Sequence, residues 1–431
     1  MRNTHASGRV QSLDVLRGTA IIGTLLTNIW IFTQITDSPE SVRGAPAGLF
    51  GEALNTGISD LSDMLSNGKF LSLLSILFGV GMAIQFESAM RHGHRWPWRY
   101  EWRSLLLLAD GFLHFALVVD FDILMGYALV AMAVAPLLLL RTRWLVLAGA
   151  VAGVFHLCMQ FREASTSLNA GSAAETPERL PVGDWMARGT DAGAASLGYF
   201  DQVAHRLSNF WELRAEAFQI APPLTAFLFI MGVLLWRAGL FKADDRAKRL
   251  STWLAVGGLG FGVPAMLWPR LPLPGAEVPD SLARYTVAPL VAFGYLGLIL
   301  VLLRRGGGQG FLSRRLAAVG RTALSCYMLQ NVLAMIAFNA WGLHLGPLDS
   351  VGTIIAWAVI SAILMLAASM WLRRFRQGPF ELVWKAAVEA PFRERDRRRA
   401  APAGPPEKAA TRQRPQAERH HNDNNAPTGA T

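Results

Sequence analysis

The chain has 431 residues, of which 52% are hydrophobic and only 17% are charged, whereas soluble domains carry roughly a quarter charged residues. Its formal charge of +10 comes from basic clusters that separate long apolar runs, a pattern typical of a chain whose solvent is mostly lipid. These features exclude an ordinary soluble domain. The placement of the basic residues also argues against a nucleic-acid partner and favours contact with the lipid bilayer.

The apolar runs predict an all-α polytopic membrane protein with about ten transmembrane helices, because each spanning helix needs roughly 20 mostly apolar residues. The first run, Leu13–Ile35, is too long for the apolar part of a signal peptide and is interpreted as a retained helix. Nine further runs approach the required length, at residues 70–90, 104–120, 122–140, 143–161, 219–239, 251–269, 285–303, 322–342 and 352–372.

Lysine and arginine alternate between the predicted loops in a way that sets the orientation. With the N-terminus inside, the inner loops hold the basic clusters near residues 91–103, 141–143, 237–249 and 304–321. The outer short loops hold only Arg43, Lys69, Arg270 and Arg284. By the positive-inside rule, we expect both termini to be cytoplasmic and the chain to be a multi-pass protein of the inner (cytoplasmic) membrane.

This topology divides the chain into six segments. Residues 1–12 are a cytoplasmic N-terminus, 13–161 the first five spans, and 162–218 a long outer loop whose second half looks helical. Residues 219–372 are the last five spans, 373–385 a membrane-proximal motif, and 386–431 a basic cytoplasmic tail that we expect to be disordered. The tail contains His420 and His421, and a solvated tail explains them better than a metal site, so we predict no metal site.

Ionisable residues inside spans are costly and therefore candidates for function. In the third span, Asp110 and His114 are four residues apart and share a helical face. A carboxylate there can fix the tautomer of the imidazole, which makes His114 a candidate general base. Asp122 follows at the outer turn, where an acidic residue can equally serve as a helix cap. His114 could also be a histidine that only packs in the interior, and both alternatives stay open.

Other spans add polar residues. Asp14 and Arg17, three residues apart near the inner face, are either an ion pair that anchors the helix or the entry for an anionic donor. Arg321 lies at the same face and could meet donor phosphates, as arginine does well. Further polar residues within the predicted spans are Asn28, Tyr127, Tyr327 and Gln330.

A series of short motifs runs through most of the chain: Ser12–Gly18, Lys69-Phe70, Leu77–Gly81, Gly111–His114, Asp122–Leu124 with Tyr127, Met231-Gly232 with Gly239–Phe241, Gly320–Ser325 with Tyr327, and Gly378–Lys385. In their order and spacing these motifs resemble the YeiB-like family, a group known as domain of unknown function 418. This chain has Phe121 where the family usually has glycine, and its last motif also departs from the usual one. Because Asp110 is not part of the family pattern, its pairing with His114 rests on the residues alone.

The opening motif and the hydropathy are also similar to those of a wider group of transmembrane acyltransferases, which includes the acyltransferase-three proteins and the lysosomal heparan glucosaminide acetyltransferases. That resemblance implies transfer of an acetyl-like group from a cytoplasmic donor such as acetyl-CoA. The donor would be a co-substrate, with no bound cofactor, and the acceptor a small molecule, sugar or lipid at or across the membrane. In this hypothesis His114 is the general base, Asp110 or Asp122 orients it, and Asp14, Arg17 and Arg321 line the donor site.

Two other functions stay open. In a transporter or exporter of a small molecule, Asp110 and His114 would form a proton relay, although the two five-span halves show no convincing internal similarity of the kind common in transporters. In a non-catalytic membrane partner, the basic tail and the segment Phe380–Arg395 would bind lipid or another protein.

Overall fold

The computed structural model describes residues 2–33, 51–171, 197–268, 282–306 and 310–392. The chain divides into two compact units, Met1–Val388 and Glu389–Thr431, and of the second unit only residues up to Phe392 are described. The tail predicted to be disordered therefore lies almost wholly outside the described residues. The stretch 172–196 of the predicted outer loop also lies outside them.

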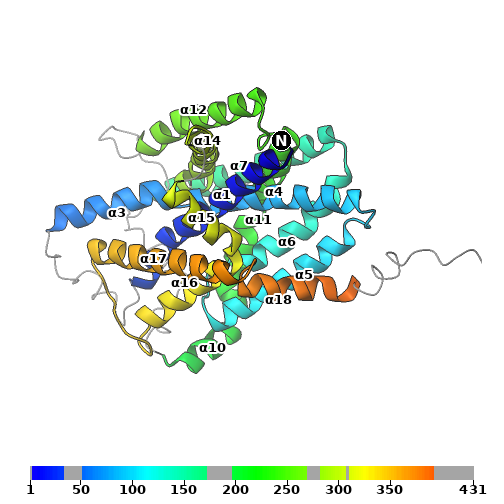
Figure 1. Ribbon diagram of the computed structural model, residues 1–431. Coiled ribbons are helices and arrows are strands. Elements are labelled where there is room, and N and C mark those ends of the chain that lie inside the picture. The colour runs from blue at the N-terminus through cyan, green and yellow to red at the C-terminus, as the bar shows by residue number, and fades with distance from the viewer. Residues whose placement is uncertain (1, 34–50, 172–196, 269–281, 307–309, 393–431) are drawn as a thin grey trace, which may run out of the picture. The chain divides into compact units, whose positions relative to one another are not determined.

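Within the described residues the chain is helical and contains no β-strand (Figure 1). The α-helices are α1 (Arg2–Thr33), α3 (Glu52–Ser66), α4 (Lys69–Arg91), α5 (Trp98–Leu117), α6 (Leu124–Val134), α7 (Thr142–Gly171), α10 (Tyr199–Ser208), α11 (Phe210–Arg237), α12 (Asp245–Leu267), α14 (Ala288–Arg305), α15 (Phe311–Arg321), α16 (Ala323–Phe338), α17 (Ser350–Arg374) and α18 (Pro379–Glu389). Short 3-10 helices, η1 (Ala135–Leu139) and η4 (Ala390–Phe392), follow α6 and α18, and a π-helical turn, η3 (Ala283–Val287), precedes α14.

Several of these helices have the length and composition to cross a membrane. Among the described residues six qualify, at Gln11–Thr33, Glu52–Arg91, Thr142–Thr166, Asp245–Leu267, Arg284–Arg305 and Ser350–Arg374. The apolar helices at Leu124–Leu139, Pro222–Arg237 and Ala323–Phe338 are shorter. The chain is thus an all-α, membrane-type protein, as its composition predicted. Each predicted span falls on a helix, while the number of crossings and the side of each terminus stay predictions.

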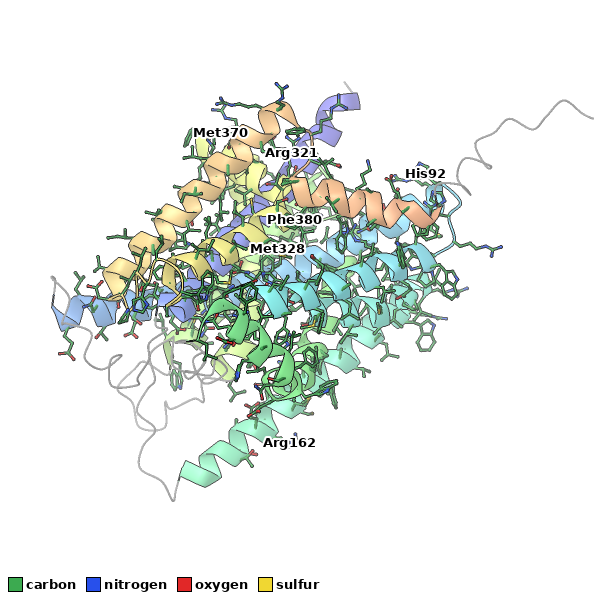
Figure 2. The ribbon with its side chains drawn as sticks, turned by 90° about the horizontal axis from the view of Figure 1, so that it is seen from below. His92, Arg162, Arg321, Met328, Met370 and Phe380 are labelled. Carbon is green, nitrogen blue, oxygen red and sulfur yellow. The ribbon has the colours of Figure 1, made fainter. Side chains whose placement is uncertain are left out.

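The helix surfaces are apolar where a soluble protein would be polar. On α7, Val151 and Phe155 are 61% and 55% exposed, and on α12, Phe261 is 74% exposed. In water such patches would favour aggregation, whereas lipid is a good solvent for them. Met370 of α17 is exposed in the same way and is labelled in Figure 2. The low charge content of the sequence is therefore reflected in apolar side chains exposed on the helix surfaces.

Glycines allow the closest helix contacts. A Cβ placed on Gly320 of α15 would lie 1.8 Å from the carbonyl oxygen of Asp14 on α1, and one on Gly18 would lie 1.9 Å from the oxygen of Leu316. The pair α4 and α11 makes the same kind of contact through Gly79 and Gly232. Small residues let helix backbones approach this closely within membranes. All four of these glycines belong to the motifs noted in the sequence.

Some helices extend beyond the predicted spans. Helix α7 continues to Gly171, and α11 begins at Phe210, so both enter the segment predicted as an outer loop. The expected helical stretch Asp201–Phe218 is divided into α10 and the start of α11 at Asn209. Helix α3, in a stretch expected to be a loop, is separated from α4 by Asn67 and by Gly68, whose φ of 74° is readily adopted by glycine.

Helix α10 is fastened by side-chain hydrogen bonds to the ends of two other helices. The Tyr199 hydroxyl donates to the oxygen of Leu117 at 3.1 Å, and Arg206 donates to the oxygen of Ala116 at 3.2 Å. Gln202 donates to Asn339 Oδ1 at 2.9 Å, just past the end of α16. Helix α10 therefore links the C-terminal ends of α5 and α16, the two helices that carry the residues described next.

Candidate functional site

A buried histidine–carboxylate pair lies at the end of α5. His114 Nδ1 is 2.8 Å from Asp122 Oδ1, and the two residues are only 3% and 1% exposed. Burying a charged group is costly unless it is paired and hydrogen-bonded. The other contacts of Asp122 meet that requirement.

The local chain explains how Asp122 returns to His114. Helix α5 ends at Leu117, and a short turn leads into α6. Asp122 Oδ2 accepts hydrogen bonds from the backbone N–H groups of Leu124 at 2.8 Å and Met125 at 3.2 Å, which the first turn of a helix otherwise leaves unpaired. Asp122 is therefore both the helix cap and the partner of His114, since each of its oxygens does one of the two.

Helix α16 completes the surroundings of the pair. The Tyr327 hydroxyl donates to Asp122 Oδ1 at 3.3 Å, and its ring lies 5.3 Å from the His114 ring. Asn331 Nδ2 lies 3.3 Å from His114 Nε2. An amide nitrogen can only donate, so with this orientation Nε2 accepts and Nδ1–H donates to Asp122. The unprotonated Nε2 then faces Asn331, which the sequence analysis did not place in the site.

Arg214 of α11 hydrogen-bonds to the backbone of the turn between α5 and α6. Its guanidinium donates to the backbone oxygens of Asp122 at 2.6 Å and Asp120 at 3.0 Å, and it lies over the Phe115 and Phe218 rings. Burial lowers the pKa of the Arg214 guanidinium, and the nearby Asp122 carboxylate opposes this effect. Sequence reasoning missed Arg214 because it lies in the predicted outer loop. The available signal was an arginine only a few residues before an apolar run.

Asp110 and Gln330 differ from the residues above, because each has a buried polar atom that makes no hydrogen bond within the described residues. No hydrogen bond joins Asp110 to His114, and Asp110 Oδ2 is buried with no hydrogen-bond partner in the described part of the chain. Gln330 on α16 is fully buried, and neither its Oε1 nor its Nε2 has a hydrogen-bond partner among the residues that the structure describes. An unpaired amide in an apolar interior costs several kcal/mol (about 2–7). Gln330 lies about one helical turn from Tyr327 and is next to Asn331 in the chain, so it is a candidate contact for a polar ligand.

Two further predicted polar residues lie apart from the pair. The Tyr127 hydroxyl is 2.5 Å from Ser75 Oγ and donates to the oxygen of Leu71 at 3.1 Å, so it fastens α6 to α4. Asn28 is half-buried on α1 and makes no hydrogen bond with any other residue that the structure describes. Their positions give these two side chains no contact with His114.

The predicted donor-site residues lie together at the other end. Arg17 Nη1 is 4.0 Å from Asp14 Oδ1, and Asp14 also interacts electrostatically with Arg321. Arg103 of α5 is close enough to repel Arg17 electrostatically, although the sequence suggested only a role in topology for it. Arg103 and His114 are eleven residues apart on α5, which is about 16 Å along a helix. The arginine cluster near Arg103 and the histidine–aspartate pair at His114 are therefore separated along α5.

Glu381 of α18 supports α16 at its first turn. Glu381 Oε1 accepts from the N–H groups of Leu324 at 2.8 Å and Ser325 at 3.2 Å, and Oε2 accepts from the Ser325 hydroxyl. Phe380, labelled in Figure 2, donates its N–H to Ser325 Oγ at 3.1 Å. A carboxylate at a helix N-terminus pairs free N–H groups and complements the helix dipole. The Gly378–Lys385 motif thus fixes the helix that carries Tyr327 and Asn331.

We expect Glu381→Ala to destabilise the protein by about 1–2 kcal/mol, the usual cost of a lost helix cap. Glu381→Gln should cost less, because an amide oxygen can still accept from the two N–H groups. The measurement is the unfolding temperature in detergent. Glu52→Gln, at an exposed glutamate in the first turn of α3, is the matched control. Unfolding of Glu381→Ala at the wild-type temperature would show that this contact does not hold α16.

The fold and the site together define a helical membrane-type protein with a buried histidine–aspartate pair. The family model of the protein of unknown function DUF418 matches residues 235–390. The chain is also 25% identical over 401 residues to the uncharacterised protein YxaH of Bacillus subtilis, which covers 90% of this chain and 96% of YxaH. These matches confirm the resemblance to the YeiB-like, DUF418 family that the motifs predicted.

Two further relatives extend over most of the chain. The uncharacterised protein YeiB of Escherichia coli is 28% identical over 413 residues, covering 87% of this chain and 94% of YeiB. An uncharacterised 39.9 kDa protein of Bacillus acidopullulyticus is 24% identical over 397 residues, covering 88% and 93% of the two chains. The names of these relatives carry no activity, so a function has to be argued from the site.

Proposed function

We propose that the protein is a membrane acyltransferase that moves an acetyl-like group from a cytoplasmic CoA-type donor to an acceptor at or across the membrane. The single observation that supports this most is the buried hydrogen bond between His114 Nδ1 and Asp122, which leaves the other ring nitrogen, Nε2, beside the Asn331 amide. A positioned base of this kind contributes about 10²–10⁴-fold to a rate.

In this proposal His114 Nε2 removes the proton from an acceptor hydroxyl or amine. The acceptor oxygen or nitrogen then bonds to the thioester carbonyl carbon, the carbon–sulfur bond breaks, and the proton passes from His114 to the departing thiolate. Asp122 holds the ring and stabilises the imidazolium while it carries the proton. In this proposal Asn331 and Gln330 are the amides that bind the acceptor or the carbonyl oxygen, since Gln330 has no hydrogen-bond partner within the described ranges.

The arginine cluster near Arg103 forms the donor site in the same proposal. Arg17 and Arg321, with Arg103 close to Arg17, provide guanidinium groups that suit phosphates. Asp14 holds Arg17 in place. A donor with its phosphates at this cluster needs a long flexible arm to bring a thioester about 16 Å along α5 to His114. Acetyl-CoA has that form, which is why we propose it as the co-substrate.

The test uses the full-length protein in liposomes made from a bacterial lipid extract, supplied with labelled acetyl-CoA and a panel of amino sugars. We expect label in the lipid or sugar fraction, together with an equal amount of free CoA thiol. The competing function is transport, for which Asp110 and His114 would have to exchange a proton. Proton-driven efflux of solutes from these liposomes without any thiol release would contradict acyl transfer and favour transport.

A further inference from the structure

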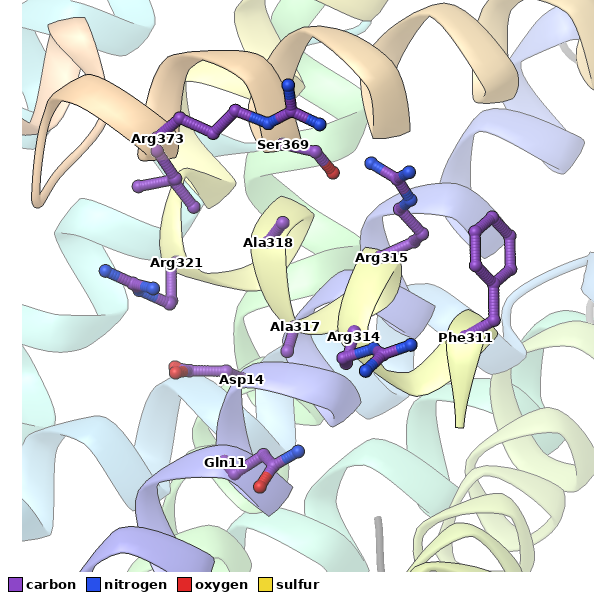
Figure 3. Close-up of a pocket in the computed structure, with 11 residues that line it drawn as sticks. Gln11, Asp14, Phe311, Arg314, Arg315, Ala317, Ala318, Arg321, Ser369 and Arg373 are labelled. Atoms are coloured by element: carbon purple, nitrogen blue, oxygen red, sulfur yellow. The ribbon is translucent and has the colours of Figure 1, made fainter. Parts of the chain in front are cut away.

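An arginine-rich pocket lies where α1, α15 and α17 meet (Figure 3). Its volume is about 960 Å³. Helix α15 crosses between the other two helices, and in Figure 3 Ser369 lies between the guanidinium groups of Arg315 and Arg373. The charged residues that line the pocket are Asp14, Arg314, Arg315, Arg321 and Arg373.

The charge of this pocket is unbalanced within the described structure. Asp14 is its single carboxylate, and it already faces Arg17 and Arg321. No described carboxylate forms an ion pair with Arg314, Arg315 or Arg373. Like charges gathered around one cavity repel each other, and an anion with several acceptor oxygens would relieve this repulsion. Guanidinium groups match phosphate oxygens in geometry as well as in charge.

The pocket lies where a lipid-facing surface ends. Along α17, the exposed side chains Val359, Ile363, Leu366 and Met370 are spaced three or four residues apart, so they form one stripe on a helix face. Arg373 lies three residues beyond Met370 on the same stripe, and the helix ends at the next residue, Arg374. On α15, Phe311 is 68% exposed at the rim of the same pocket. A phosphate held here would lie where the exposed apolar stripe of α17 ends.

We propose that this pocket binds the phosphate of an anionic phospholipid whose acyl chains lie along the exposed stripe of α17. Arg373 and Arg315 contact the phosphate from α17 and α15, and Phe311 packs against the lipid. Arginines at membrane ends commonly serve topology alone. Arg373 and Arg315, however, line one cavity from two different helices, which topology alone does not require. The pocket shares Asp14 and Arg321 with the proposed donor site. The lipid proposal rests on Arg315 and Arg373 instead, so its test leaves Asp14 and Arg321 unchanged and reads lipid binding rather than acyl transfer.

The experiment counts lipids bound to the full-length protein by native mass spectrometry in detergent, with phosphatidylglycerol or phosphatidylcholine added. We expect wild type to retain phosphatidylglycerol in preference to phosphatidylcholine. The double variant Arg315→Gln with Arg373→Gln should bind phosphatidylglycerol about tenfold more weakly, as expected for the loss of charged hydrogen bonds. The control, Arg246→Gln with Arg249→Gln, removes the same charge from exposed positions near the start of α12 and should bind as wild type does.

Three results would overturn the lipid site. One is equal retention of the two lipids by wild type, and another is an equal loss of binding in both double variants, which would mean a general charge effect. The third is displacement of phosphatidylglycerol by glycerol phosphate at similar concentration, since the ligand would then be a soluble phosphate. Unfolding temperatures of both double variants, measured without added lipid, separate a lost site from a lost fold.

Discussion

His114→Ala should lower the single-turnover rate of acyl transfer by about 10²–10⁴-fold, the usual contribution of a general base. In the tautomer that fits the orientation of the Asn331 amide, Nδ1–H donates to Asp122 and Nε2 is the ring nitrogen that can accept a proton. Alanine also leaves the Asp122 carboxylate buried without His114, which is destabilising in its own right. His114→Gln is therefore the more informative variant, since its amide can donate to Asp122 but cannot accept a proton as a base.

The matched control is His156→Gln. His156 is also a buried histidine of a predicted span, 4% exposed, and its Nε2 contacts the backbone oxygen of Tyr285 at 2.9 Å. It has no contact with Asp122 or Asn331, so its replacement should leave the transfer rate unchanged. Both variants are compared at equal folded fraction, judged by unfolding temperature. A His114→Gln protein that transfers label at the wild-type rate would eliminate His114 as the base.

Gly320→Ala should produce the largest loss of stability among the single changes considered, about 3 kcal/mol or more, at the upper end of what overpacking costs. The added methyl group would lie 1.8 Å from the oxygen of Asp14 and 2.9 Å from the nitrogen of Gly18. Neither atom belongs to a flexible side chain, so α1 and α15 have to separate. The measurement is the unfolding temperature in detergent, together with the yield of folded protein.

Gly126→Ala controls for the general effect of adding a methyl group to a helical glycine. It lies within α6, and a Cβ placed there meets no heavy atom within 4 Å. Alanine favours helices over glycine by up to about 1 kcal/mol, so this variant should be as stable as wild type or more so. If Gly320→Ala unfolded at the same temperature as Gly126→Ala, the close contact between α1 and α15 would be wrong.

Much of this fold could be predicted from local sequence patterns. Hydropathy located the helices because the length of an apolar run is set by the thickness of the bilayer. The motif glycines were visible in the sequence as a pattern. The sequence did not show why glycine is needed there, because each close helix contact joins residues that are far apart in the chain. Gly18 and Gly320 are separated by about 300 residues and meet only through the packing of α1 on α15. Such pairing is a property of tertiary structure.

The candidate site shows the same limit more sharply. Helical periodicity placed Asp110 on the same helix face as His114, yet the carboxylate that is hydrogen-bonded to His114 is that of Asp122. The deciding feature is the turn between α5 and α6, whose backbone path returns Asp122 to the preceding helix. Asn331 and Arg214 reach the pair from α16 and α11. Periodicity within one helix carries no information on which residues of other helices it meets.

The tautomer of His114 is the most direct test of the proposed chemistry. The full-length protein labelled with ¹⁵N-histidine can be compared with its His114→Gln variant by NMR in lipid, so that the His114 signals are identified among the nine histidines of the chain. We predict that the neutral ring carries its proton on Nδ1 and that Nε2 is bare. A ring protonated on Nε2 instead would leave no base directed to Asn331, and the proposed transfer mechanism would be contradicted.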